Sequence, residues 1–220
     1  MTNRQRELAS LLTRAENTAD VGCDHGILSL YLLQNDLTQH LVATDISGKS
    51  LQKTATLLRK NGYIDRAECL VCDGIPADRD FDQVLIAGMG GNEICKILSN
   101  YFDRNSSRPT LILQPMRDFY KVRKLLNSLG YEIVVDRLIF DKKFYLLIKA
   151  IVGSQILSEK ELLFGAIEDS YSTPIFLSWL NTKISKTTQI LSQIDVSDPK
   201  FNEFTQFLQQ CENLKGSIKC

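Results

Sequence analysis

The sequence predicts an α/β fold with a doubly wound, mostly parallel sheet, followed by a small helical appendage. Short apolar runs alternate with longer helical patterns through about residue 150. Strands joined by helices of this length form βαβ crossovers, and therefore a parallel sheet. The β-rich runs Tyr131–Phe140 and Phe144–Ala150 are joined by only three charged residues, which is typical of a hairpin. We therefore expect an antiparallel strand to finish the sheet.

The individual elements follow from apolar spacing and from the residues that interrupt it. The expected strands are Thr18–Val21, Leu41–Thr44, Ala67–Cys72, Gln83–Ala87 and Thr110–Leu113. The expected helices between them are Ile27–Leu33, Ser50–Asn61, Asn92–Tyr101 and Asp118–Leu129. Asn61-Gly62 and Gly130 end the second and fourth of these helices.

The strand signals stop after Gly153. Apolar residues at 180, 184, 191 and 194, with Thr187 among them, alternate steps of four and three, which predicts a coiled-coil-like helical seam. Asp198-Pro199 supplies an N-cap and a proline for a second helix. We expect two antiparallel helices in a short hairpin. The predicted domains are residues 1–152, with the sheet, and residues 153–220, with the helices.

Composition narrows the functional classes. Lysine and arginine together balance aspartate and glutamate at 26 each, which argues against a broad electrostatic grip on nucleic acid. Local clusters, Arg4-Arg6-Arg14 and Arg117-Lys121-Arg123-Lys124, remain candidates for phosphate contacts or for plain solvated helix faces. The sequence has neither a membrane-length apolar run nor an export signal, so we expect a cytoplasmic protein.

Cysteine spacing predicts reduced thiols and no metal site. The six cysteines are scattered, and Cys69 and Cys72 form a single C-x-x-C without a second pair. The chain has only two histidines. On a strand the odd spacing of Cys69 and Cys72 sends their side chains to opposite faces.

The most informative segment is the first strand and its loop, which read Thr18-Ala-Asp20-Val-Gly22-Cys-Asp24-His25-Gly26. A glycine directly after a strand lets the backbone turn tightly and approach a ligand closely. The dinucleotide-binding fingerprint has a glycine where this chain has Asp24, and a carboxylate there repels pyrophosphate. A carboxylate at position 24 can instead bind a cationic ligand or face the molecule that accepts a transferred group. Asp24 can also have a purely structural role as the N-cap of the next helix.

Acids also follow the next two strands. Asp45 ends the second strand about 20 residues beyond the loop, where a carboxylate can accept hydrogen bonds from ribose hydroxyls. Asp73-Gly74 follows the third strand, where an acid can accept a hydrogen bond from an adenine amino group and glycine leaves room for the ring. Three acids after three successive strands predict a nucleoside-binding edge.

A glycine-rich loop, Ala87-Gly88-Met89-Gly90-Gly91, follows the fourth strand. Such a loop allows close approach to a cofactor, base or phosphate, and Met89 can pack on a flat ring. A tight strand–helix turn explains the same glycines equally well.

With these motifs, LIAGMGG, LILQP and KKFY, the sequence resembles the bacterial tRNA adenine-22 N1-methyltransferases, the TrmK family. The resemblance runs from near Arg4 to about Ala150 and continues more weakly into the helical tail. It implies a class I methyltransferase Rossmann-like sheet, S-adenosylmethionine as cofactor, S-adenosylhomocysteine as product, and tRNA as partner. The chain departs from the family at Met116, where asparagine is usual, at Ala166, where proline is common, and in the first loop, which lacks an aromatic residue.

The resemblance implies a role for each residue that matches a motif of the family. The expected cofactor-binding residues are Asp20, Gly22, Asp45, Asp73, Gly74 and Gly88, and the expected substrate-binding residues are His25 and Met89. Asp24 is the candidate catalytic residue, which holds the N6 amino group of a flipped adenine and stabilises the charge that develops on the base. His25 is equally well explained as a packed hydrogen-bonding group. Aromatic candidates for base stacking, or for the core, are Phe119, Tyr120, Tyr131 and Tyr145.

Two other functions fit the same sequence. One is a methyltransferase with a small-molecule or protein acceptor, and the other is a non-catalytic RNA-binding module on the same fold. Neither a metal nor a membrane is expected. The sequence does not fix the oligomeric state, for which a monomer is the starting hypothesis.

Overall fold

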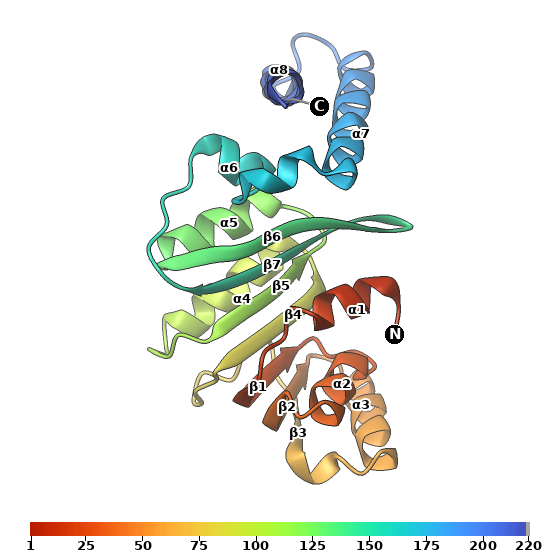
Figure 1. Ribbon diagram of the computed structural model, residues 1–220, viewed down its shortest axis with the longest axis vertical. Coiled ribbons are helices and arrows are strands. Elements are labelled where there is room, and N and C mark those ends of the chain that lie inside the picture. The colour runs from red at the N-terminus through yellow and green to blue at the C-terminus, as the bar shows by residue number, and fades with distance from the viewer. Residues whose placement is uncertain (219–220) are drawn as a thin grey trace. The chain divides into compact units, whose positions relative to one another are not determined.

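The computed structural model describes residues 1–218 and contains a seven-stranded sheet (Figure 1). Its strand order is β3-β2-β1-β4-β5-β7-β6. The strands are β1 (Ala15–Val21), β2 (Thr38–Asp45), β3 (Ala67–Val71), β4 (Gln83–Met89), β5 (Thr110–Pro115), β6 (Tyr131–Asp141) and β7 (Lys143–Val152). The pairings are parallel except those that β7 makes with β5 and β6. The predicted parallel sheet with a closing antiparallel hairpin is confirmed.

Helices pack on both faces of this sheet, because the central strands are apolar on both faces. Leu85 and Ile112 face a core with α1 (Asn3–Ala9), α2 (Ile27–Gln34) and α3 (Gly48–Lys60), the last followed by the short 3-10 helix η1 (Ile64–Arg66). Their neighbours Ile86 and Leu113 face the other core, with α4 (Gly91–Phe102) and α5 (Phe119–Ser128). Alternate residues of one strand thus bury two separate helix layers.

Helix α1 was not predicted from the sequence. It begins with a capping box, in which Thr2 accepts a hydrogen bond from the Gln5 backbone and the Gln5 side chain accepts one from the Thr2 backbone. Leu8 and Ala9 are buried against the sheet. The Arg4 backbone N–H donates to Asp141 Oδ2 at 3.0 Å, which ties α1 to the β6–β7 hairpin.

The chain divides into two compact units, with the boundary between Ala166 and Ile167. The first unit therefore includes α6 (Glu159–Phe164), beyond the predicted domain end at residue 152. A buried ion pair accounts for the extension: Arg123 Nε and Nη2 donate to the two Asp136 oxygens at 2.7 and 2.9 Å. Arg123 Nη1 also donates to the Leu162 carbonyl, and the Ala166 N–H donates to Asp136. Residues 159–166 thus complete the hydrogen bonding of two buried charges.

The second unit contains a 3-10 helix, η2 (Glu168–Ser172), and the helices α7 (Pro174–Leu191) and α8 (Phe201–Ser217). The two predicted helices are present, but Figure 1 shows α8 end-on beside an upright α7, so they cross rather than run antiparallel. The seam is correspondingly short: Leu180 and Thr187 are buried, whereas positions 184, 191 and 194 are only half-buried. Helix α8 begins at Phe201 rather than at proline 199, because Asp198 Oδ1 caps a turn by accepting the Lys200 N–H.

The cysteines of residues 1–218 are free thiols; Cys220 lies outside the described residues. Cys69 packs beside buried Cys23 in a small apolar cluster. Within residues 1–218 there is no group of three or more histidine, cysteine or acidic side chains that could hold a metal ion. No helix in this range is long and apolar enough to cross a membrane.

The buried pair predicts where the first unit can be cut. A chain that ends at residue 168 should keep its cooperative urea unfolding, whereas a chain that ends at residue 153 should lose at least about 3 kcal/mol of unfolding free energy. In the shorter chain Arg123 and Asp136 lose their hydrogen bonds to Leu162 and Ala166. The shorter chain also exposes the apolar surface that Phe164 covers. The longer chain ends two residues past the boundary, so its new carboxylate stays away from Asp136. Equal stability of the two chains would place the domain end at residue 152.

Candidate active site

The carboxyl ends of β1, β2, β3 and β4 border a cavity of about 630 Å³. That volume lies within the range of small-molecule sites. All nine residues that the sequence singled out line it: Asp20, Gly22, Asp24, His25, Asp45, Asp73, Gly74, Gly88 and Met89. The structure therefore brings together residues from the ends of four strands and from the segments that follow them.

Strand register explains this convergence. Val21 of β1 pairs with Thr44 of β2 and with Ile86 of β4, so the three strands end at nearly the same level. The N–H groups of Gly22 and Cys23 both donate to the Thr44 carbonyl, at 2.8 and 3.0 Å. The first loop is thereby turned over the end of β2, next to Asp45.

Gly22 has a left-handed backbone, with φ of 70°, and lies against Met89. A Cβ at position 22 would overlap Met89 Cε. The backbone conformation at position 22 therefore favours glycine, whereas the end of the flexible Met89 side chain could shift to relieve the overlap. Met89, which was predicted to pack on the substrate, packs here on the first loop at the wall of the cavity.

Asp45 fixes the first loop and still borders the cavity. Its Oδ2 accepts the Asp24 N–H at 3.3 Å, and its Oδ1 accepts the Ser47 N–H at 2.8 Å. Each carboxylate oxygen can accept more than one hydrogen bond, so capacity remains for ligand hydroxyls.

Asp73 is exposed and has a partner that the sequence did not suggest. Lys96 Nζ, from α4, donates to Asp73 Oδ2 at 3.3 Å and lies 3.7 Å from Glu93. The hydrogen bond that Lys96 donates to Asp73 raises the pKa of Lys96. One Asp73 oxygen keeps its full acceptor capacity at the cavity wall. An i, i+3 pair on the predicted α4 helix, Glu93 and Lys96, was the only sequence signal for this arrangement.

Asp24 and His25 form an exposed pair at the mouth of the cavity. His25 Nδ1 lies 2.6 Å from Asp24 Oδ2. Asp24 has a left-handed backbone with φ of 47°, and its carbonyl accepts a hydrogen bond from Thr54 Oγ1 at 3.0 Å. Aspartate tolerates this conformation better than most residues. Asp24 does not cap helix α2, whose N-cap is Gly26 and receives no side-chain bond.

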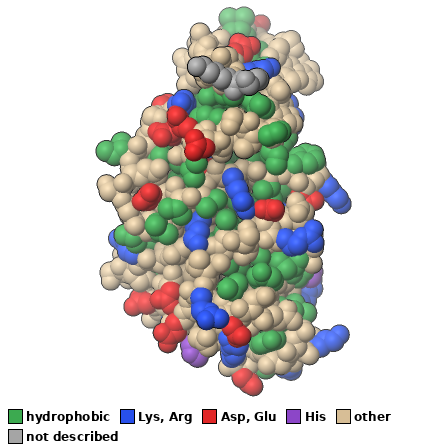
Figure 2. All heavy atoms as spheres, viewed as in Figure 1, with side chains coloured by type: hydrophobic (Ala, Val, Ile, Leu, Met, Phe, Trp, Pro, Cys, Tyr) green, Lys and Arg blue, Asp and Glu red, His purple; other side chains and the backbone are tan. Residues whose placement is uncertain are grey.

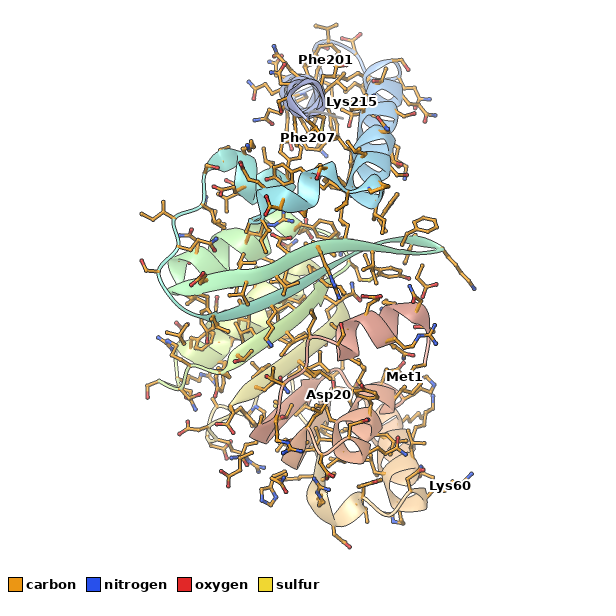
Figure 3. All side chains as sticks on the ribbon, in the orientation of Figure 1. Met1, Asp20, Lys60, Phe201, Phe207 and Lys215 are labelled. Carbon is orange, nitrogen blue, oxygen red and sulfur yellow. The ribbon has the colours of Figure 1, made fainter. Side chains whose placement is uncertain are left out.

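Asp20 is the buried acid of the site (Figure 3). It is 4% exposed, and Ser29 Oγ of helix α2 donates to its Oδ2 at 2.5 Å. Burial raises the pKa of Asp20 to about 6, against the lowering effect of the Ser29 hydrogen bond. At neutral pH the cavity wall therefore contains a buried negative charge, which favours a cationic ligand.

The glycine-rich loop serves two purposes. Gly88 has a φ of 82° and lines the cavity, where a Cβ would stand 3.8 Å from Arg4 Nη1. Gly91 instead packs against the β5–α5 turn: its N–H donates to the Arg117 carbonyl, and a Cβ would lie 2.6 Å from that oxygen. Gly91 thus forms a tight strand–helix turn, and Gly88 lines the cavity.

Arg4 is the site residue that the sequence analysis placed only in a general basic cluster. It lines the cavity from helix α1, and its Nη1 donates to Gln114 Oε1 at 2.9 Å. Its guanidinium lies over the Tyr145 ring, 5.2 Å from the centroid. The Thr2–Gln5 capping box was the sequence signal that could have revealed this helix. Of the aromatic candidates, Tyr131 is fully buried and belongs to the core.

Comparison with known proteins decides the family. A family model described as a methyltransferase domain matches residues 1–148. The chain belongs to this methyltransferase family. The tRNA (adenine(22)-N(1))-methyltransferase of Bacillus subtilis strain 168 is 25% identical over 204 residues, which span 88% of this chain and 85% of that protein.

Solved structures show that the similarity extends over the whole chain. M. capricolum TrmK, in complex with the natural cofactor product S-adenosyl-homocysteine, superposes with a TM-score of 0.91 at 26% identity, over 100% of this chain and 99% of that chain. A ribosomal protein L11 methylase of Lactobacillus delbrueckii subsp. bulgaricus matches 70% of this chain and 80% of its own with a TM-score of 0.56, at 18% identity, and shares the fold alone. The resemblance to the TrmK family is thus confirmed.

The raised pKa of Asp20 predicts how stability depends on pH. The pKa of Asp20 is about 6 in the folded methyltransferase, above the ordinary aspartate value of 3.8, so the folded state binds more protons between these two pH values. This group's contribution therefore falls as pH rises through that window and stays constant above it. The stability difference between Asp20→Asn and wild type should become about 2 kcal/mol more favourable to the variant between pH 4.5 and pH 7.5. Urea unfolding at the two pH values measures this.

The asparagine amide can also change the free energy of unfolding by an amount that does not depend on pH. Taking the difference between the two pH values removes that contribution. Asp103→Asn, at an exposed acid on the C-cap of α4, is the control and should give a pH-independent difference. The same pH dependence in both variants would mean that Asp20 carries no special burial penalty.

Proposed function

We propose that this methyltransferase transfers a methyl group from S-adenosylmethionine to N1 of the adenine at position 22 of tRNA. The observation that carries the proposal is the single cavity that gathers Asp45, Asp73, Gly22 and Gly88 from four successive strands. The relatives named for this reaction, with their near-complete coverage, support it. A tRNA substrate also places the proposed reaction in the cytoplasm.

The cavity fits the cofactor chemically. S-adenosylmethionine supplies an electrophilic methyl group on a positively charged sulfur, which a nitrogen lone pair can attack without a metal or a covalent enzyme intermediate. Asp45 would accept ribose hydroxyls, Asp73 would accept the adenine amino group, and Gly74 would leave room beside the ring. Gly22 and Gly88 allow close backbone approach, and buried Asp20 favours the cation.

Asp24 is the proposed catalytic residue. It stands at the cavity mouth with its carboxylate exposed, and one oxygen is held by His25. The second oxygen is available to accept a hydrogen bond from the N6 amino group of an adenine turned out of its helix. Methylation at N1 leaves the base positively charged, and a carboxylate beside N6 stabilises that charge or takes a proton. His25 is proposed to position Asp24 and the base.

Met89 is proposed to contact the base at the far side of the loop. Its thioether already lies against Gly22, where the first loop and the β4 loop meet. A polarizable, flexible side chain at that junction can adapt to a flat ring.

The test is mass spectrometry of tRNA nucleosides after incubation with protein and cofactor, with the modified position mapped. Wild-type protein should produce 1-methyladenosine at position 22. Asp24→Asn should lower the rate of transfer about 100-fold and change the affinity for S-adenosylhomocysteine less than about twofold, because the substitution removes charge but keeps size.

The matched control is Asp36→Asn. Asp36 is also an exposed aspartate with a left-handed backbone, with φ of 50°, but its carboxylate pairs with Arg66 away from the cavity. It should leave transfer unchanged. Unchanged transfer by Asp24→Asn would exclude a catalytic role for Asp24, and methyl label found only in protein or small molecules would overturn the tRNA assignment.

A further inference from the structure

The β6–β7 hairpin extends past the edge of the sheet that carries the cavity. Leu113 of β5 pairs with Ile148 of β7 in antiparallel register. Each step forward along β5 corresponds to one step back along β7. Extended in this way, the register places Lys143 three residues beyond the end of β5, or about 10 Å. In Figure 1 the paired ribbons of β6 and β7 run well past the neighbouring strands, above helix α1.

Three cations gather at this tip without acidic partners. Arg4 Cζ and Lys143 Nζ each lie 5.2 Å from the centroid of the Tyr145 ring. Lys142 occupies the turn with a φ of 66°. Within residues 1–218, none of the three forms an ion pair with a carboxylate. The nearby acid, Asp141, accepts the Arg4 backbone N–H instead.

Two aromatic rings lie on the opposite face of the same hairpin tip, because Phe144 alternates along β7 with Lys143 and Tyr145. Phe140 and Phe144 pair edge to face across the hairpin, with centroids 5.1 Å apart. Phe140 remains 53% exposed, although burying a phenylalanine stabilises a protein by roughly 1.5–3 kcal/mol. The protruding tip thus carries cations on one face and an exposed ring on the other, and both kinds of group suit a ligand with flat apolar faces and negative charge.

Charge is therefore separated across the site. The cavity wall is acidic, with Asp20, Asp24, Asp45 and Asp73, whereas the hairpin side is basic. Arg4 connects the two, since it lines the cavity beside Gly88 and also stacks on Tyr145. Figure 2 shows basic and acidic side chains interspersed over the face it displays, and the chain has no net charge, so the group of cations at the hairpin differs from the mixed charge of that face.

We propose that Arg4, Phe140, Lys142, Lys143, Phe144 and Tyr145, here called the hairpin cluster, bind the RNA strand next to the nucleotide that enters the cavity. Lys142, Lys143 and Arg4 contact the phosphates, and the exposed ring of Phe140 stacks on an unpaired base. The inference rests on the proposed function and names the part of the fold that holds its substrate. It also assigns the β6–β7 hairpin a role besides closing the sheet.

The test uses the full chain with S-adenosylhomocysteine bound and measures tRNA affinity over a range of salt concentrations. The double variant Lys142→Gln/Lys143→Gln should weaken tRNA binding roughly tenfold and lower the slope of log affinity against log salt by about 1.5, because two phosphate contacts are lost. Phe140→Ala should weaken binding with an unchanged slope, because stacking carries no counterion release. S-adenosylhomocysteine affinity should stay the same in both variants.

The matched control is Lys53→Gln/Lys60→Gln, which removes the same charge from the exposed face of α3; Lys60 is labelled in Figure 3. It should leave both affinity and slope unchanged. Equal effects of the two double variants, or no effect of the hairpin double variant and Phe140→Ala, would overturn the hairpin cluster while tRNA methylation by wild type continued. A folded wild-type chain that binds cofactor but neither binds nor methylates tRNA would overturn the proposed function, and this inference with it.

Discussion

The level register of the parallel strands is the constraint on which the site depends. β1 lies between β2 and β4, and the pairing of Val21 with both Thr44 and Ile86 sets all three carboxyl ends at one edge. The residues that follow these strands therefore lie close together, because each connection to the next element begins at this edge of the sheet. The site requires no long insertion: Asp45 and Gly88 lie near the ends of β2 and β4, and Gly22 directly follows β1, so all three border one cavity.

The electrostatics of the site follow from the same arrangement. Acids after successive strands concentrate negative charge on a small wall, and burial of Asp20 places part of that charge inside the protein. A cationic ligand lowers the cost of holding these carboxylates together. The basic side chains lie elsewhere, on helix α1 and the β6–β7 hairpin, which approach the cavity through Arg4. Two regions of opposite charge thus suit two ligands of opposite charge.

Local sequence patterns predicted most of the sheet and nine of the residues that line the cavity, because short sequence segments determine where strands end and where glycines lie. The patterns failed where long-range contacts decide. Helix α1 is only seven residues long and is held by the sheet and by Asp141, so its apolar spacing gave little signal. The Asp73–Lys96 pair joins two elements whose spacing along the chain carries no information about distance. The first unit extends past residue 152 because Arg123 and Asp136, two ordinary surface-type residues in the sequence, are buried together. The crossing of α7 and α8 depends on which few residues are buried, and a regular apolar spacing does not encode it.

Calorimetric titration of the purified chain with S-adenosylhomocysteine, without tRNA, tests the central claim most directly. We expect one binding site per chain, and a roughly tenfold weaker site in Asp45→Asn, because a hydrogen bond to a charged acceptor is worth about 1.5–3 kcal/mol. Absence of binding heat with folded wild-type protein, or equal affinity in the variant, would contradict it.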